Sequence, residues 1–234
     1  QVLDLIVPLL QDSHRAIRIE AARLLAGTPA SNNSNFNLVR QEYIDSQQLN
    51  ADRAASLANL ANLARKEGRL ADAENHLLDA LRKEPYYIPA AVNLSDLYRM
   101  TNRHTESGQI LRDTIAQIDD NAELHLAYAL WLVRNQQLDV ASQHIQRAIE
   151  LGQEPHFRFV YALALQQQGK TLLALAELDK AAEMPRYNRD VQSARIDLAW
   201  QAGMKDRAIS YLELWRQLDP EDPAIKQWQA QARP

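Results

Sequence analysis

The sequence has 234 residues, of which 46% are hydrophobic and 24% charged; this suits one or two globular domains or one elongated array. Its 26 basic and 30 acidic residues are well mixed and give a formal net charge of −4, without the basic stripe that is typical of nucleic-acid-binding proteins. The absence of cysteine excludes disulfides, zinc–thiolate sites and covalently attached haem within this sequence. The apolar runs are shorter than the ~18 residues of a membrane span, so we predict none.

Residues 1–27 predict a pair of helices. The stretch VLDLIVPLL starts in helical register, Asp12 and Ser13 predict a tight turn, and a second helix continues to Gly27. The positions of Pro8, Asp12, Arg15, Arg18 and the pair Ala21–Ala22 resemble one HEAT repeat. One such unit cannot bury its apolar stripe alone, and the sequence begins with Gln rather than Met. We therefore expect a fragment of a longer array, whose apolar N-terminal helices could also self-associate.

A linker and a single helix follow. Residues 28–35, TPASNNSN, are rich in turn-forming residues and predict a linker. Residues 36–53 hold one predicted helix, from Phe36 to Leu49, in which Val39, Tyr43 and Ser46 stand 34 positions before Ala73, Leu77 and Ala80. This helix thus takes the place of the second helix of an incomplete repeat.

The rest of the sequence repeats with a period of 34 residues. Ala73 is followed at this interval by Ser107 and Ala141, and Leu77 by Leu111 and Ile145. Each unit shows two apolar stripes of helical period separated by a short turn. The predicted units are residues 54–87, 88–121, 122–154, 155–188 and 189–220.

This pattern resembles the tetratricopeptide repeat (TPR), in which each unit is a helix–turn–helix of 34 residues with small residues at fixed positions. The resemblance implies an all-α fold: a right-handed α-α superhelix of about four to five repeats. Helices whose contact faces carry Ala or Ser approach closely, so small residues let the helices of each hairpin nest and the next hairpin stack. The fifth unit is the least regular, because Arg195 stands at its seventh position.

The series of small residues ends at Trp215, where another hairpin would need a small side chain. The segment PEDPAIKQWQAQA follows. Residues 221–234 therefore predict a capping helix, with Trp228 against the last groove. Repeat arrays need such a polar-backed end to remain soluble.

Residues that could carry chemistry do not form a recognisable set. The six histidines, at positions 14, 76, 104, 125, 144 and 156, show no metal-binding spacing, and we expect solvated surface side chains because a metal site needs converging ligands. No phosphate-binding loop or nucleophile motif occurs. We expect no catalytic, cofactor or metal site, and no enzyme.

The resemblance also implies that the first helix of each unit lines the concave surface through positions 2, 5, 6, 9, 12 and 13. The candidate residues are polar at one end, Asn59, Asn62, Arg65, Asn93, Asp96 and Arg99, and apolar at the other, Leu126, Leu130, Phe159 and Leu163. Repeats that bind extended peptides often carry Asn at position 6, the place of Asn59 and Asn93, because an amide can pair with any peptide backbone. The alternative is that all of these residues only solvate and pack the inner wall.

Three positions argue against a clamp for a C-terminal carboxylate in this groove. Ala58 stands where a lysine is needed, and Glu123 and Ala127 stand where two cations are needed. The sequence predicts a protein-interaction scaffold that binds a peptide or protein partner in the groove.

The alternative is an accessory C-terminal region of a larger exported redox protein. The stretch from Leu49 to Arg99 resembles repeat regions of bacterial exported multihaem c-type cytochromes, which would favour the periplasm. The haem or catalytic part would then lie outside this sequence.

Overall fold

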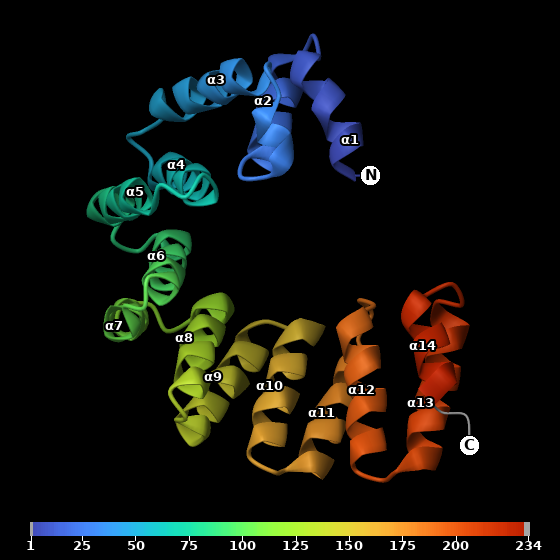
Figure 1. Ribbon diagram of the computed structural model, residues 1–234. Helices are drawn as coiled ribbons and strands as arrows, with labels where there is room; N and C mark the ends of the chain where they lie inside the picture. Colours follow the sequence, from blue (N-terminus) through green and yellow to red (C-terminus); the bar gives the residue numbers. More distant parts are fainter. Residues whose placement is uncertain (1, 232–234) are drawn as a thin grey trace. The chain divides into compact units, whose positions relative to one another are not determined.

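The computed structural model describes the backbone of residues 2–231 and the side chains of residues 2–228. Within these ranges the chain is α-helical, with two short 3-10 helices and no strand. It divides into two compact units, Gln1–Ile118 and Asp119–Pro234, and Figure 1 shows that each consists of helices joined by short connections. The all-α prediction is confirmed.

The first unit begins with a helix pair, as predicted for residues 1–27. Its elements are α1 (Val2–Ile6), the 3-10 helix η1 (Val7–Gln11) and α2 (Arg15–Leu25). The first helix of the pair continues as the 3-10 helix η1, and Pro8 lies in the first turn of η1. We attribute this change of geometry to the proline, which cannot donate an amide hydrogen bond. The predicted turn is present: Asp12 Oδ1 accepts the backbone N–H of His14 at 2.7 Å.

The predicted linker contains a short 3-10 helix, η2 (Pro29–Asn32), and is followed by α3 (Phe36–Gln48). The buried side chains of Leu10, Leu25, Phe36 and Val39 share one core. Arg18 joins α2 to α3 because its Nη2 donates to both carboxylate oxygens of Glu42, at 3.0 and 2.9 Å. Val2 and Leu5 of α1 are exposed; self-association through them stays a prediction.

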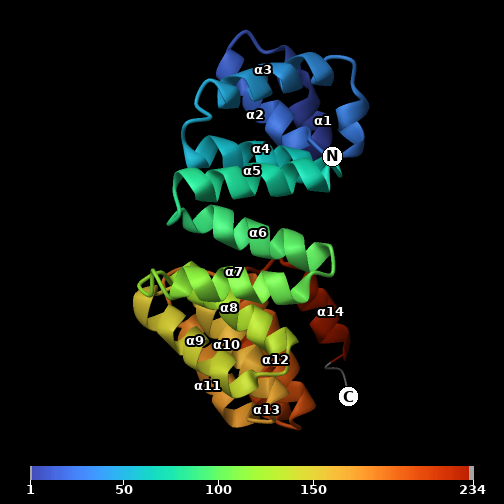
Figure 2. The same cartoon turned by 90° about the vertical axis from the view of Figure 1, so that its left-hand side faces the viewer.

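Two helical hairpins complete the first unit, α4 (Ala54–Lys66) with α5 (Leu70–Lys83), and α6 (Ile88–Met100) with α7 (His104–Ile115). Figure 2 shows α4 and α5 side by side. The turn of the first hairpin contains Gly68 at φ +76°, a left-handed conformation that glycine adopts without strain. Asn102 has the corresponding role in the second hairpin at φ +61°.

The second unit contains three further hairpins and a last helix. The hairpins are α8 (Ala122–Arg134) with α9 (Leu138–Leu151), α10 (Pro155–Gln167) with α11 (Thr171–Ala182), and α12 (Arg189–Gln201) with α13 (Lys205–Leu218). The last helix is α14 (Pro223–Gln231).

Small side chains lie at the helix contacts, as the 34-residue period predicts. Ala73, Ser107, Ala141, Ala174 and Ala208 are each at most 1% exposed. Ala80, Thr114, Ala148 and Ala181 are also buried. Ser107 meets Ser95 across the α6–α7 hairpin, with 2.9 Å between the two hydroxyl oxygens. The repeated small residues therefore permit the close approach of neighbouring helices.

The C-terminal helix covers the last hairpin. Trp215 is fully buried, and Trp228 of α14 is 9% exposed in the same core, beside Ile225. The expected contact of Trp228 with the end of the repeats is therefore present. The helix begins after Asp222, whose Oδ1 accepts the backbone N–H of Ala224 at 2.9 Å; residues 232–234 of the predicted cap lie outside the described part.

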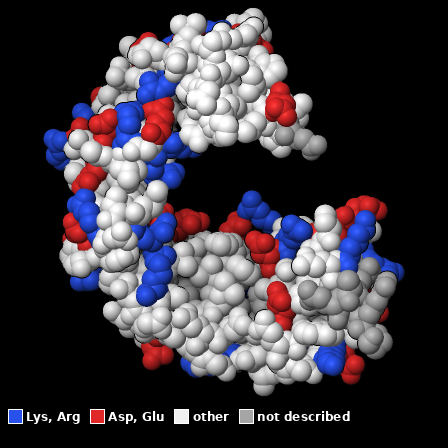
Figure 3. All heavy atoms as spheres, viewed as in Figure 1, with Lys and Arg blue, Asp and Glu red and all other residues white. Residues whose placement is uncertain are grey.

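Charges of both signs occur side by side on the molecular surface. Figure 3 shows Lys and Arg side chains next to Asp and Glu side chains in several places on the visible face of each unit. Several of these neighbours form ion pairs, for example Arg103 with Glu74 at 2.7 Å. None of the helices in the described part of the chain has the length and apolarity required to cross a bilayer.

Candidate functional site

The six polar candidate residues all lie on the first helices of two neighbouring hairpins in the first unit. Asn59, Asn62 and Arg65 belong to α4, and Asn93, Asp96 and Arg99 to α6. The two helices contact each other directly. All six side chains are exposed or half-buried, so they form an accessible face, which we call the polar inner face.

Several of these groups have free hydrogen-bonding capacity. Asn62, Arg65 and Asn93 make no side-chain hydrogen bond with another residue in the described part of the chain. Asn59 donates from Nδ2 to Oε1 of Gln47 at 3.0 Å, which leaves its carbonyl oxygen available. Arg99 Nε donates a hydrogen bond to Asp96 Oδ1 at 3.2 Å. The amides therefore offer donors and acceptors to a ligand.

The apolar candidates lie in the second unit and differ in accessibility. Leu130 of α8 and Phe159 of α10 are half-buried, and Leu163 of α10 is 44% exposed. Leu126 is only 4% exposed and packs in a core with Val160 and Ala164. The expectation that Leu126 lines an open groove is therefore not met, because the neighbouring first helix covers this position.

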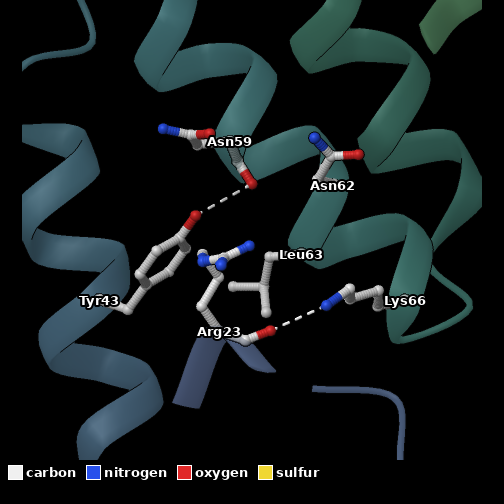
Figure 4. A pocket seen from close by; sticks show the side chains of 6 residues that line it. All are labelled: Arg23, Tyr43, Asn59, Asn62, Leu63 and Lys66. Atoms are coloured by element: carbon white, nitrogen blue, oxygen red, sulfur yellow. Dashed lines mark hydrogen bonds between the residues drawn. The ribbon is translucent and has the colours of Figure 1, made fainter. Parts of the chain in front are cut away.

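A pocket of about 230 Å³ opens where α2, α3 and α4 meet. Figure 4 shows its side chains: Arg23 from α2, Tyr43 from α3, and Asn59, Asn62, Leu63 and Lys66 from α4. Tyr43 and Leu63 are buried and form the inner wall, whereas Arg23, Asn59 and Lys66 are exposed at the rim. The structure thus combines two predicted residues, Asn59 and Asn62, with groups that come from outside the regular repeats.

Arg23 and Tyr43 were not predicted as site residues. They belong to the helices before the first complete repeat, where the repeat frame assigns no groove position. The 34-residue offset places Tyr43 in register with Leu77 but marks it only as a packing residue. No periodic signal identifies Arg23, because its approach to α4 is a tertiary contact.

Positive charge dominates the pocket. Lys66 Nζ donates to the backbone carbonyl oxygen of Arg23 at 2.9 Å. The side chain of Lys66 is exposed as a whole, but partial desolvation of its ammonium group, followed by the charges of Arg23 and Arg65, lowers its pKa. Glu20 is the nearby anion, and it binds Arg23 Nε at 2.8 Å. Burial raises the pKa of the Tyr43 phenol, so that group stays neutral.

Two histidines in the second unit depart from the expectation of solvated surface side chains. His125 is 5% exposed, and its Nδ1 lies 2.8 Å from Nδ1 of His144. The Nε2 atom of His125 lies 2.9 Å from the carbonyl oxygen of Asp119. The described residues contain no group of three or more His, Cys, Asp or Glu side chains that could hold a metal ion.

Comparison with protein families gives two matches. Residues 64–130 and residues 162–223 each match a model described as tetratricopeptide repeat. Together the matches cover more than half of the chain. Neither reaches residues 1–27, so the HEAT-like interpretation of that segment stays a prediction, as does the resemblance to multihaem cytochromes. The search of curated proteins gives no significant match.

Solved structures share the fold at low sequence identity. PilF of Pseudomonas aeruginosa is 16% identical with a TM-score of 0.61, over 99% of this chain and 100% of that one. TTC0263 of Thermus thermophilus is 20% identical with a TM-score of 0.60, over 85% of this chain and 97% of that one. YrrB, described as a TPR protein with an unusual peptide-binding site, is 19% identical with a TM-score of 0.56, over 80% of this chain and 96% of that one.

The repeat spacing, the buried small residues, the family matches and the shared fold agree with one another. The chain belongs to the tetratricopeptide repeat proteins.

Proposed function

We propose that this chain is a scaffold that binds an extended segment of a partner protein along the polar inner face of α4 and α6. Tetratricopeptide repeats generally act through such curved surfaces. The observation that carries the proposal is the pair Asn59 and Asn93, equivalent positions of successive first helices whose amides retain free hydrogen-bonding groups.

The spacing of the two amides suits a peptide backbone. First helices that pack together lie about 8–10 Å apart, and an extended chain advances about 3.3 Å per residue. Asn59 and Asn93 would therefore engage peptide groups about three residues apart. Since each amide carries both a donor and an acceptor, this pairing would not depend on the side chains of the ligand.

Apolar side chains in the second unit provide a second type of contact. Leu130, Phe159 and Leu163 remain partly or largely accessible. Complete burial of one side chain of this size contributes about 1.5–3 kcal/mol. We expect these residues of the second unit to bind apolar side chains of a partner, independently of the amides of the first unit.

The comparisons do not favour the alternative of an accessory region in an exported redox protein. The matches are to tetratricopeptide repeat models and to structures of this fold. This fold typically serves as a non-catalytic scaffold, and we propose binding without chemistry.

The test is a peptide-display selection against the intact chain, followed by affinity measurements by fluorescence anisotropy. The double variant Asn59→Ala/Asn93→Ala should weaken the selected peptides about tenfold or more, because two hydrogen bonds to the ligand are lost. The control is Asn75→Ala, an exposed asparagine on the second helix α5, which should leave the affinity unchanged. Unaltered binding to the double variant would contradict the proposal.

A further inference from the structure

The pocket between α2, α3 and α4 has a composition that the regular repeats do not supply. Lys66, Asn59 and Asn62 extend the polar inner face into it, and α2 adds Arg23 (Figure 4). Tyr43 and Leu63 form an apolar wall behind these groups. The pocket is therefore continuous with the surface to which we assign peptide binding.

Several donors in this pocket remain available. Lys66 Nζ uses one hydrogen for the carbonyl oxygen of Arg23, and an ammonium group has three. Arg23 is held by Glu20 through Nε and Nη2, and its Nη1 has no partner within the described residues. Asn62 is likewise without a side-chain hydrogen bond there. Three donors from two helices thus border one small space.

The charge of the pocket is not balanced from within. Arg23 and Lys66 line it and Arg65 acts on Lys66 from the same helix, whereas one carboxylate, that of Glu20, acts on both Arg23 and Lys66. An anionic ligand would relieve this repulsion and would accept charge-assisted hydrogen bonds, which are about twice as strong as neutral ones.

We propose that this pocket binds a carboxylate of the partner segment, so that the chain prefers acidic peptides. This inference rests on the proposed function. The carboxylate would accept from Lys66 Nζ, Arg23 Nη1 and Asn62 Nδ2, and its methylene groups would lie against Tyr43 and Leu63. An Asp or Glu side chain and a C-terminal carboxylate have this chemistry in common.

The experiment uses peptides obtained from the display selection. Each is prepared with its acidic residues and with Asn or Gln in their place, and each version with a free and an amidated C-terminus. The acidic versions should bind the intact chain about tenfold more tightly, because a hydrogen bond to a charged group is stronger than one to a neutral group. The C-terminal amide separates the two sources of the carboxylate.

The variant Lys66→Gln should remove most of this preference, so that the acidic and the uncharged versions of a peptide bind with similar affinity. Lys66→Arg should retain the preference because the charge stays. The control is Lys83→Gln, an exposed lysine at the end of α5, which should behave as the unaltered chain does.

Two results would overturn the inference: a selection without acidic residues or a C-terminal requirement, or a preference for acidic peptides that persists in Lys66→Gln. If binding still depended on Asn59 and Asn93, the proposed function would stand and only the carboxylate pocket would be wrong. A selection that returns no binding peptide would refute both.

Discussion

At the scale of single residues, the pair of histidines in the second unit shows how a hydrogen bond selects the tautomer of a neutral imidazole ring. The carbonyl oxygen of Asp119 can only accept, so Nε2 of His125 carries the proton. Nδ1 of His125 must then accept from Nδ1–H of His144, 2.8 Å away. The ring of Tyr128 packs edge-on against His144.

The pair should make stability depend on pH. Burial, followed by the neighbouring His125, lowers the pKa of His144 below 6.5. The unfolded chain therefore binds the proton more readily than the folded chain. The contribution of neutral His144 to the stability of the fold is complete above pH 6.5 and is lost as the pH falls through the folded-state pKa. We expect the free energy of unfolding in urea to fall between about pH 7 and pH 5, and His144 to contribute to that fall.

The variant His144→Gln should show a smaller slope over this range, and the exposed His156→Gln should keep it. Burial also lowers the pKa of His76 in the first unit, so part of the slope should remain in both variants. A pH profile identical in His144→Gln and the unaltered chain would contradict the assignment.

Arg195 shows where a residue-level pattern is insufficient. It occupies the seventh position of the fifth repeat, where an apolar residue is expected, yet it is 9% exposed. Its guanidinium lies 2.9 Å from Asp179 and 4.0 Å from the ring centroid of Tyr211. The repeat period identifies position 195 as irregular, but it does not predict the ion pair with Asp179, because Asp179 belongs to another hairpin.

The same distinction holds for the candidate site. Asn59 and Asn93 could be predicted because they share one repeat position, and both lie on accessible first helices. Leu126 could not be judged from its position alone, since its burial depends on Val160 and Ala164 of α10. The pocket between α2, α3 and α4 could not be predicted from the sequence for a similar reason, because Arg23 contacts α4 only in the folded chain.

At the scale of elements, the hairpins follow from local sequence, whereas the terminal helices depend on packing. The spacing of Ala73, Leu77 and Ala80 predicts the buried stripe of α5, and all three are buried. The N-terminal helix was predicted as one element but changes to 3-10 geometry at Val7. The proline next to this position indicates that the α-helix can be interrupted there, but it does not determine which backbone geometry replaces it.

The last helix, α14, gives an element-level prediction. Trp228 is 9% exposed and shares a core with Trp215 and Ile225. Replacement by alanine in Trp228→Ala should lower the free energy of unfolding by about 3 kcal/mol, because a large buried side chain is lost and a cavity remains.

The exposed neighbour Gln227 provides the control on the same helix, and Gln227→Ala should change stability little. Both variants can be compared by urea unfolding followed by tryptophan fluorescence and circular dichroism. Equal midpoints for the two variants would show that α14 does not stabilise the last hairpin.

At the scale of the whole molecule, each unit has its own hydrophobic core. The cores of the first unit contain residues between Leu10 and Tyr98, and those of the second unit residues between Leu126 and Trp228. In repeat proteins stability is approximately a sum of repeat and nearest-neighbour terms, so distant repeats can open independently.

A substitution in one core should therefore act locally. Ala141 of α9 is fully buried, and Ala141→Leu should overpack its hairpin at a cost of about 1–3 kcal/mol. Amide hydrogen exchange, read by mass spectrometry, should accelerate in α8–α11 while α2–α5 keep their protection, because the stabilities of separate regions are reported individually. The exposed residue two positions further along the same helix gives the control Gln143→Leu, which should leave exchange unchanged. An equal loss of protection in both units would instead mean that the 34-residue repeats unfold as one cooperative body.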